Sequence, residues 1–208
     1  MNRLERWGLL ERPIRRVGGL QAGSAAAIWM LTSTGQRLRN LHAGRGAIGR
    51  VREPGERFIR HYLAIGDAHL QLIAAARAMK LELLTVQIEP ACWRSYTSLG
   101  GNRETLKPDL YAVTASADYE DHWFIEIDRA TESLPVLIRQ CQQYQAYRRS
   151  GTEQEASGVF PRVIWVVPDN ARADQLRAAI ASSRNLDDDL FIVTTPEAFI
   201  QVITRGAA

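Results

Sequence analysis

Three carboxylates stand in or beside apolar segments of this 208-residue chain. Asp109 follows Pro108 and precedes the apolar run LYAV, while Glu126 and Asp128 flank Ile127 at the end of HWFIEID, residues 122–128. A buried carboxylate is costly unless a cation or a hydrogen-bond donor accompanies it. Carboxylates in such segments therefore need partners, which could be a metal ion, arginines or backbone amides.

The spacing of these acids predicts that they meet. Alternation along a strand puts Glu126 and Asp128 on one side, together with Phe124. If segments 109–115 and 122–128 are antiparallel neighbours, Asp109 lies opposite residues 126–128, and three carboxylates converge at one end of a sheet. Oxygen ligands of this kind suit Mg²⁺ or Mn²⁺. The alternative to a metal site is that the acids have a purely structural role and pair with arginines such as Arg129 and Arg139.

The elements that must position these acids can be read from the periodicity of apolar residues. Spacings of three and four from Glu56 to about Leu84 predict one helix, or two helices that meet near Gly66. Strands are predicted at 85–93, 109–115, 122–128, 163–167 and 190–195, and helices at 133–149, 171–183 and 196–204, with loops at 95–107 and 151–161. This order predicts an α/β fold whose mixed sheet begins as an antiparallel meander and continues through parallel crossovers. The run VIWVV, residues 163–167, predicts a central strand covered on both faces.

The first quarter of the chain has a different pattern. A glycine-rich stretch, residues 18–23, lies between two extended apolar pieces, which predicts a β-hairpin with a long tip. The segment Thr32-Ser33-Thr34-Gly35 then opens a helix with Leu38 and Leu41 on one face. We therefore divide the chain into a hairpin segment (1–41), a Gly/Arg linker (42–55) and an α/β domain (56–208).

Basic residues are concentrated near the start of the chain. The formal net charge is only +3, yet residues 1–60 hold twelve arginines and four acids. Guanidinium groups pair with phosphate in a bidentate way, so this distribution favours partners that carry phosphate, such as nucleic acid. The alternative, which charge alone leaves open, is a solvated basic surface. The DNA-contacting candidates are Arg12, Arg15, Arg16, Arg129 and Arg139.

Several classes of protein are disfavoured. No apolar run approaches the roughly 20 residues of a membrane span, and the N-terminus lacks the apolar stretch of a signal peptide. The two cysteines, Cys92 and Cys141, are far apart and form no CxxC pair, which argues against a thiolate zinc site and favours a reducing compartment. We expect a cytoplasmic protein with no membrane partner.

Four of these features together resemble a nuclease core. Pro108-Asp109, Glu126-Ile127-Asp128, and the Gln-x-x-x-Tyr patterns of Gln140 and Gln143 are similar to the motifs of RecB-like PD-(D/E)xK nucleases. The resemblance implies a nuclease-like mixed-sheet core. It also implies Mg²⁺ or Mn²⁺ held by Asp109, Glu126 and Asp67, with Asp128 and Gln140 as further catalytic residues.

The chain departs from that nuclease pattern at one position. The family has lysine where Asp128 stands, and the two lysines of this chain, Lys80 and Lys107, lie elsewhere. Arg139 on the following helix could replace it as a phosphate-holding group, although arginine cannot serve as a base at neutral pH. A metal site could therefore survive while hydrolysis is lost or slow.

A second resemblance covers nearly the whole chain. The order of GLLERP, hairpin and LTSTGQRL is similar to the wing of winged helix-turn-helix proteins of the MarR or PadR kind. The helices that would precede such a wing are missing before Gly8, so the module is either trimmed to its wing or begins upstream of Met1. Together with KPDLY and FIEIDRATESL, this partial winged helix resembles the replication-relaxation family of bacterial plasmids and integrative elements.

This resemblance implies a DNA-binding accessory protein of replication or mobilisation, built on a nuclease-derived domain. Its expected partners are DNA and a plasmid relaxase or replication protein, with oligomerisation left open. Two alternatives remain. The protein could be an active Mg²⁺- or Mn²⁺-dependent endonuclease or nickase that uses Asp109, Glu126 and Asp128, or it could be a non-catalytic protein-interaction module.

Overall fold

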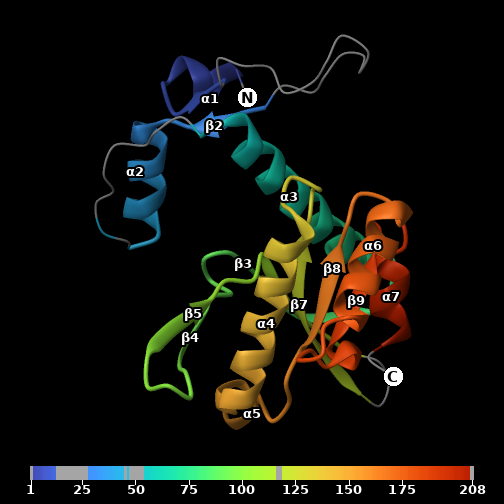
Figure 1. Ribbon diagram of the computed structural model, residues 1–208. Coiled ribbons are helices and arrows are strands. Elements are labelled where there is room, and N and C mark those ends of the chain that lie inside the picture. Colours follow the sequence, from blue (N-terminus) through green and yellow to red (C-terminus); the bar gives the residue numbers. More distant parts are fainter. Residues whose placement is uncertain (1, 13–27, 45, 47–53, 116–118, 207–208) are drawn as a thin grey trace. The chain divides into compact units, whose positions relative to one another are not determined.

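The computed structural model describes residues 2–12, 28–44, 46, 54–115 and 119–206 (Figure 1). The chain divides into two compact units, Met1–Tyr62 and Leu63–Ala208. The division falls inside helix α3 (Glu56–Arg77). Each unit is considered by itself below.

The first unit contains a short antiparallel strand pair between helices. Its elements are α1 (Asn2–Arg6), β1 (Leu10–Glu11), β2 (Met30–Leu31) and α2 (Ser33–His42). Leu10 pairs with Leu31 and Glu11 with Met30. The two extended pieces expected around the glycine-rich stretch therefore pair as predicted, whereas the expected hairpin tip lies outside the described residues.

Helix α2 begins as its sequence predicts. Thr32 is the N-cap, and its Oγ1 accepts a hydrogen bond of 3.1 Å from the Gly35 amide, which satisfies one of the unpaired donors of the first turn. The same hydroxyl donates to the carbonyl of Gly8 at 2.6 Å. Gly35 is buried, and a Cβ there would lie 2.1 Å from the backbone oxygen of Leu9. The start of α2 therefore requires both Thr32 and a glycine.

The second unit is built on a five-stranded mixed sheet in the order β3-β6-β7-β8-β9. Pairs β3–β6 and β6–β7 are antiparallel, whereas β7–β8 and β8–β9 are parallel. This confirms the predicted α/β class and the change from meander to crossovers. The strand bounds are Glu82–Ile88 for β3, Leu110–Ala115 for β6, Glu120–Ile127 for β7, Arg162–Val166 for β8 and Phe191–Thr194 for β9.

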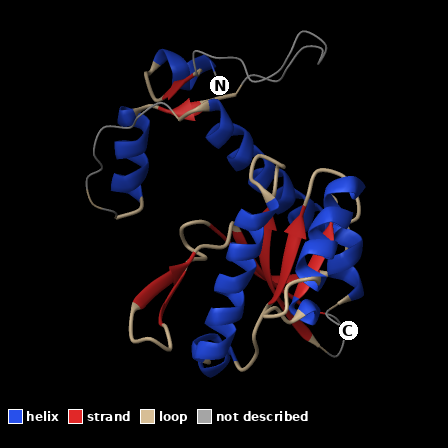
Figure 2. Ribbon diagram, in the orientation of Figure 1, coloured by secondary structure: helices blue, strands red, loops and turns tan. Residues whose placement is uncertain are grey.

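Helices cover both faces of this sheet, as Figure 2 shows. One core joins α4 (Leu134–Ser150) and α6 (Asn170–Ala181) to sheet residues such as Phe124 and Trp165. The other joins α7 (Phe199–Arg205) and the α3 residues from Ile65 onward to Trp123 and Ile125. Strand β8 contributes alternately to the two cores, so VIWVV is the doubly covered strand that its sequence predicts.

The predicted helix at 133–149 is α4. Ser133 is its N-cap residue, although its side chain makes no capping hydrogen bond, and a proline occupies the first turn. Gly151, with φ of +74°, ends the helix in the left-handed region. The buried side chains on its inner face include Leu137, Cys141, Tyr144 and Tyr147. The expected packing of both tyrosines against the sheet is therefore confirmed.

Two predicted loops are in fact regular elements. Residues 95–107 contain an antiparallel hairpin, β4 (Arg94–Thr97) with β5 (Arg103–Leu106), which extends away from the sheet in Figure 1. Within 151–161 lies helix α5 (Thr152–Ser157). The possible break near Gly66 is absent, because α3 runs unbroken from Glu56 to Arg77. A 3₁₀ turn, η1 (Asp188–Leu190), precedes β9.

No helix in the described ranges is both long enough and apolar enough to cross a membrane.

Candidate functional site

Carboxylates at the same end of three neighbouring strands, β3, β6 and β7, lie side by side. Asp109 directly precedes β6, and the register that pairs Leu110 with Ile125 places Asp109 opposite Glu126 of β7. Glu89 directly follows β3, and its amide donates a 3.1 Å hydrogen bond to the Asp109 carbonyl. A carboxylate oxygen of Glu89 lies within 4.8 Å of one of Asp109.

The side chain of Glu126 faces helix α4. Side chains alternate along β7: Phe124 belongs to the core on the α4 side and Ile125 to the core on the α3 side. Glu126, two residues after Phe124, is therefore on the α4 side. Glu126 is buried, and Oε1 accepts a short hydrogen bond from the Tyr144 hydroxyl. Burial, and then the nearby charge of Asp109, raise the pKa of Glu126 well above its ordinary value. The fold therefore disfavours the ionised form of Glu126 relative to that of a solvent-exposed glutamate.

Asp109 is held by the backbone of the adjacent strand. Its Oδ2 accepts a 2.8 Å hydrogen bond from the Ile127 amide, and the residue is 6% exposed. The preceding Pro108 carbonyl accepts from the Cys92 thiol at 2.9 Å. Burial raises the pKa of Cys92 to about 12, so this thiol stays protonated at neutral pH.

Asp128 has a different set of partners. Its Oδ2 accepts a 2.6 Å charged hydrogen bond from Arg172 of α6, and its Oδ1 accepts from the Ala130 amide at 2.9 Å. The side chains of this ion pair are 1% and 11% exposed, for Asp128 and Arg172 respectively. Arg172 also donates to the Glu132 carbonyl at 2.7 Å. Asp128 thus organises the loop that follows β7.

Asp67 lies in a cavity beside the loop that follows β7. A cavity of about 710 Å³ is lined by Asp67 and other residues of α3, by residues 127–129 and by the chain that follows β8. Its apolar lining includes Ile127, Val166 and Phe199, which belong to the α3-side core. Asp67 therefore shares a cavity with Asp128 and Arg129, whereas Asp109 and Glu126 do not line it.

The remaining predicted residues are more dispersed. Gln140 has an Oε1 that is buried without a hydrogen-bond partner, and Arg139 is exposed on α4. Arg12 lies 3.8 Å from Glu5 and 4.5 Å from the centre of the Trp29 ring. Arg15 and Arg16 fall outside the described residues.

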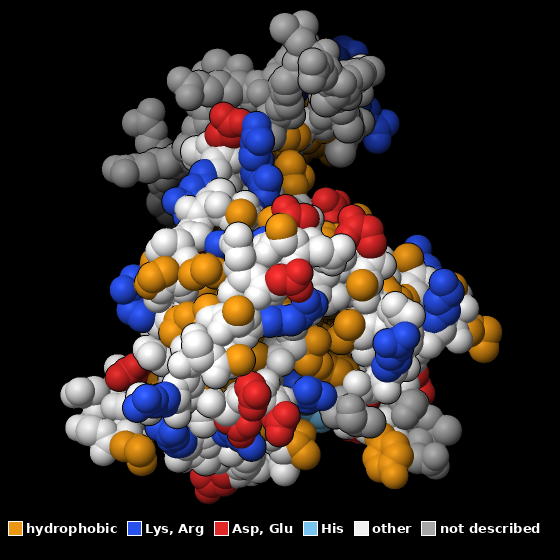
Figure 3. Space-filling view, turned by 45° about the vertical axis from the view of Figure 1, so that its right-hand side comes forward, with side chains coloured by type: hydrophobic (Ala, Val, Ile, Leu, Met, Phe, Trp, Pro, Cys, Tyr) orange, Lys and Arg blue, Asp and Glu red, His pale blue; other side chains and the backbone are white. Residues whose placement is uncertain are grey.

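Basic side chains do not form one continuous patch on the face of the α/β unit seen in Figure 3, where they alternate with acidic ones. The sequence shows that the two units differ in charge. Residues 63–208 contain fourteen basic and nineteen acidic residues, against twelve and four in residues 1–62. A polyanion is therefore attracted mainly by the first unit.

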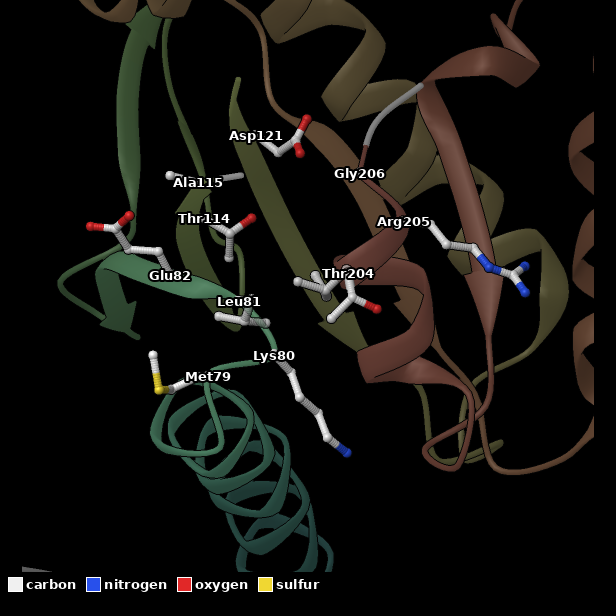
Figure 4. A pocket seen from close by; sticks show the side chains of 11 residues that line it. Met79, Lys80, Leu81, Glu82, Thr114, Ala115, Asp121, Thr204, Arg205 and Gly206 are labelled. Atoms are coloured by element: carbon white, nitrogen blue, oxygen red, sulfur yellow. The ribbon is translucent and has the colours of Figure 1, made fainter. Parts of the chain in front are cut away.

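A second cavity, of about 420 Å³, opens where the chain leaves α3 (Figure 4). Lys80, Glu82, Asp121 and Arg205 line it together with apolar residues. In Figure 4 the charged ends of Lys80, Glu82 and Arg205 point in different directions. This arrangement brings no set of charges together on one ligand position.

Two residues of the site were not anticipated from sequence. Glu89 ends an apolar strand just before Pro90, the same context that drew attention to Asp109, so its position was a usable signal. Arg172 lies 44 residues from Asp128 in the chain, and only the crossover through β8 brings α6 to it. No local pattern could have identified that partner.

The divalent ion implied by the nuclease resemblance fits part of this donor set. Asp109 and Glu89 present adjacent carboxylates of the kind that Mg²⁺ and Mn²⁺ bind. Glu126 fits less well, because a metal ligand must be ionised and burial raises the pKa of this carboxyl. Asp128 is neutralised by Arg172, and Asp67 lies in the separate cavity.

The comparison with family models decides the family. The model described as replication-relaxation matches residues 1–163. The chain belongs to the replication-relaxation family. Membership of this family indicates a role connected with replication or mobilisation. The searches of curated proteins and of solved structures gave no match.

Proposed function

We propose that this replication-relaxation protein is a DNA-binding accessory factor of plasmid or integrative-element replication or mobilisation, with a domain derived from a nuclease. The observation that carries the proposal is the placement of Asp109 opposite Glu126 on adjacent antiparallel strands, followed by a helix whose Tyr144 contacts Glu126. This is the arrangement that the PD-(D/E)xK motifs imply. Family membership supports the connection to DNA.

The first unit supplies the electrostatic part of this proposal. Its strand pair β1–β2 and the capped helix α2 are consistent with a wing, and its arginine excess suits a phosphate backbone. Phosphate contacts fix the position of a protein on DNA but carry little sequence information. We therefore expect binding to duplex DNA that depends strongly on salt.

The salt dependence of binding tests this function. Each phosphate contact adds about −0.9 to the slope of log K against log salt on duplex DNA. Replacing Arg12, Arg15 and Arg16 with Gln should flatten the slope by up to about 3. A control that replaces three exposed arginines of the α/β unit, Arg77, Arg149 and Arg184, should flatten it less. Equal slopes for wild type and first variant would contradict the wing, and absence of binding would favour a protein-interaction module.

A second candidate function is metal-dependent DNA cleavage. The row of carboxylates formed by Glu89, Asp109 and Glu126 favours it. A divalent ion held by Asp109 and Glu89 would supply Lewis-acid activation of water and stabilise charge on a phosphate. The basic group of the nuclease motif is not provided by either lysine. Lys107 lies over the Trp93 ring at 4.8 Å, and Lys80 lines the second cavity. We therefore favour binding without cleavage.

Metal binding can be measured separately from cleavage. A ligand that binds only the folded state stabilises it by RT ln(1 + [L]/Kd), which amounts to about 2.7 kcal/mol at 100 times Kd. Mn²⁺ should therefore raise the melting temperature of the wild type, and the rise should be lost in Asp109→Ala. A variant of an exposed acid, Glu104→Ala, should retain it. An equal rise in Asp109→Ala would place the ion elsewhere.

A further inference from the structure

The cavity beside the loop that follows β7 has the composition of a ligand site. Its volume of about 710 Å³ lies within the range of small-molecule pockets. Its apolar lining includes Ala64, Ala68 and Ala74 of α3, Ile127 and Val166 at the ends of β7 and β8, and Phe199 of α7. It opens at the carboxyl ends of the parallel strands β7 and β8, which is where open α/β sheets commonly bind ligands.

Four polar side chains line this otherwise apolar space, and one of them, Asp128, is already paired with Arg172. Asp67 and Gln71 are four residues apart on α3 and therefore lie on the same helix face. Arg129 lines the cavity from the loop after β7. In the described part of the chain, the side chains of Asp67 and Arg129 form neither a salt bridge nor a hydrogen bond, with each other or with another residue. A carboxylate and a guanidinium are thus both available to a ligand.

The loop that carries Arg129 is fixed in advance. The Asp128 amide donates to the Val166 carbonyl at 3.0 Å, and the Asp128 carboxylate binds Arg172 and the Ala130 amide. Ala130 adopts φ of +53°, a left-handed conformation that costs energy for a residue with a Cβ. The charged hydrogen bonds of Asp128 support this conformation, and a loop held in this way loses little entropy when Arg129 binds a ligand.

We infer that this cavity takes one unstacked nucleotide of a single-stranded or opened DNA strand. The apolar walls suit a base, and a carboxylate or amide such as Asp67 or Gln71 suits the amino groups on a base edge. The guanidinium of Arg129 suits the adjoining phosphate. A simple anion would leave the apolar walls unused, and a purely apolar ligand would leave the polar groups of Asp67, Gln71 and Arg129 unused. The inference rests on the proposed function, since it supposes that DNA is bound.

The experiment follows one base and the whole oligonucleotide separately. A fluorescein-labelled single strand reports total binding by anisotropy, and an unlabelled copy with one 2-aminopurine reports the state of that base. A 2-aminopurine that leaves the base stack becomes brighter, so its emission should rise on binding to the wild type. Arg129→Gln and Ala74→Trp should suppress that rise and weaken binding by about tenfold, the equivalent of one base contact.

Matched control variants separate changes inside the cavity from the general effects of losing an arginine or adding a large side chain. Arg184→Gln removes an exposed arginine that does not line the cavity, and Ala146→Trp adds the same bulk to the exposed face of α4. Both should keep the fluorescence rise and wild-type affinity. Ala74 is itself exposed, so Ala74→Trp should fold, and melting curves of all variants check this.

The results distinguish the two levels of the proposal. Binding by anisotropy with no change in 2-aminopurine emission would overturn the nucleotide site and leave the proposed function intact. A fluorescence rise that Arg129→Gln and Ala74→Trp both retain would also overturn it. No anisotropy change with this single strand at any protein concentration would overturn the nucleotide site. If a fluorescein-labelled duplex also gave no change, the proposed function would be contradicted as well.

Discussion

At the scale of single residues, the acids of this protein are distinguished by their partners. Asp109 accepts from a backbone amide, Glu126 from a tyrosine hydroxyl, and Asp128 from a guanidinium. All three were expected to converge, yet only Asp109 and Glu126 lie opposite each other in the register. The alternation along β7 correctly places Glu126 on the α4 side, but it gives no information about which group each carboxylate meets.

Replacing Glu126 should reveal its protonation state. Burial and Asp109 raise the pKa of this carboxyl in the folded state, so its contribution to stability is complete below the unfolded pKa and declines as pH rises through the folded pKa. Glu126→Gln keeps the shape and an acceptor for Tyr144 without the charge. At pH 7 it should raise the free energy of unfolding relative to the wild type, because the variant has no carboxyl to ionise in the unfolded chain.

Urea unfolding at several pH values measures this effect. The difference between Glu126→Gln and wild type should be near zero at pH 4 and grow toward pH 8. Glu104→Gln, at an exposed position of the hairpin, should stay within about 0.5 kcal/mol of the wild type throughout. A Glu126→Gln protein that is less stable than the wild type at pH 7 would contradict this. It would show that hydrogen-bond donors such as the Tyr144 hydroxyl stabilise an ionised Glu126.

The Asp128–Arg172 pair should be among the most sensitive positions. Both side chains are nearly buried, and removal of one partner leaves the other as an uncompensated charge. Arg172→Gln should therefore lower the free energy of unfolding by about 3–5 kcal/mol. Arg177→Gln removes an exposed ion pair on the same helix, although it also loses a bond to the Val193 carbonyl, and should cost clearly less. If Arg172→Gln and Arg177→Gln lowered the free energy of unfolding equally, the buried Asp128–Arg172 pair would matter no more than an exposed one.

At the scale of elements, predictability followed the strength of the apolar pattern. The helix from Glu56 has clear spacings of three and four, and strand β8 is a continuous apolar run. Both were predicted, although the helix ends at Arg77 and not near Leu84. The hairpin 94–106 was missed because only Tyr96 and Leu106 of its strands are buried, which leaves little alternation to read. Helix α5 was missed because five of its six residues are polar, and its one buried side chain, Glu153, binds Arg94 and Tyr147 from other elements.

Two glycines in helices should respond in opposite ways to the same substitution. Nothing lies within 4 Å of a Cβ built on Gly66 of α3, so Gly66→Ala should stabilise that helix by up to about 1 kcal/mol. A Cβ on Gly35 of α2 would meet the Leu9 carbonyl at 2.1 Å, so Gly35→Ala must displace backbone. Amide hydrogen exchange should show stronger protection in α3 for the first variant and weaker protection in α2 for the second.

If Gly35→Ala protected α2 as Gly66→Ala protects α3, the close approach of α2 to Leu9 would not exist. That result would also remove the contact that fixes the start of α2 beside the β1–β2 pair, and with it the local argument for a wing.

At the scale of the whole molecule, charge and chemistry are divided between two units. The arginine excess lies in residues 1–62, whereas the carboxylate row and the nucleotide-sized cavity lie in residues 63–208. Family membership over residues 1–163 covers both the strand pair and the carboxylates. The account therefore holds that the first unit attracts DNA and that the second contacts it without cutting it.

Incubation of supercoiled and single-stranded DNA with the wild type and Mn²⁺ tests that central claim most directly. The double variant Asp109→Ala/Glu126→Ala serves as the matched control, and anisotropy under the same conditions confirms that both proteins bind. The account predicts bound DNA that stays supercoiled or full-length with either protein, because neither lysine occupies the position of the motif lysine: Lys107 lies over the Trp93 ring and Lys80 lines the second cavity. Nicking by the wild type that the double variant lacks would contradict it and establish a metal-dependent nuclease.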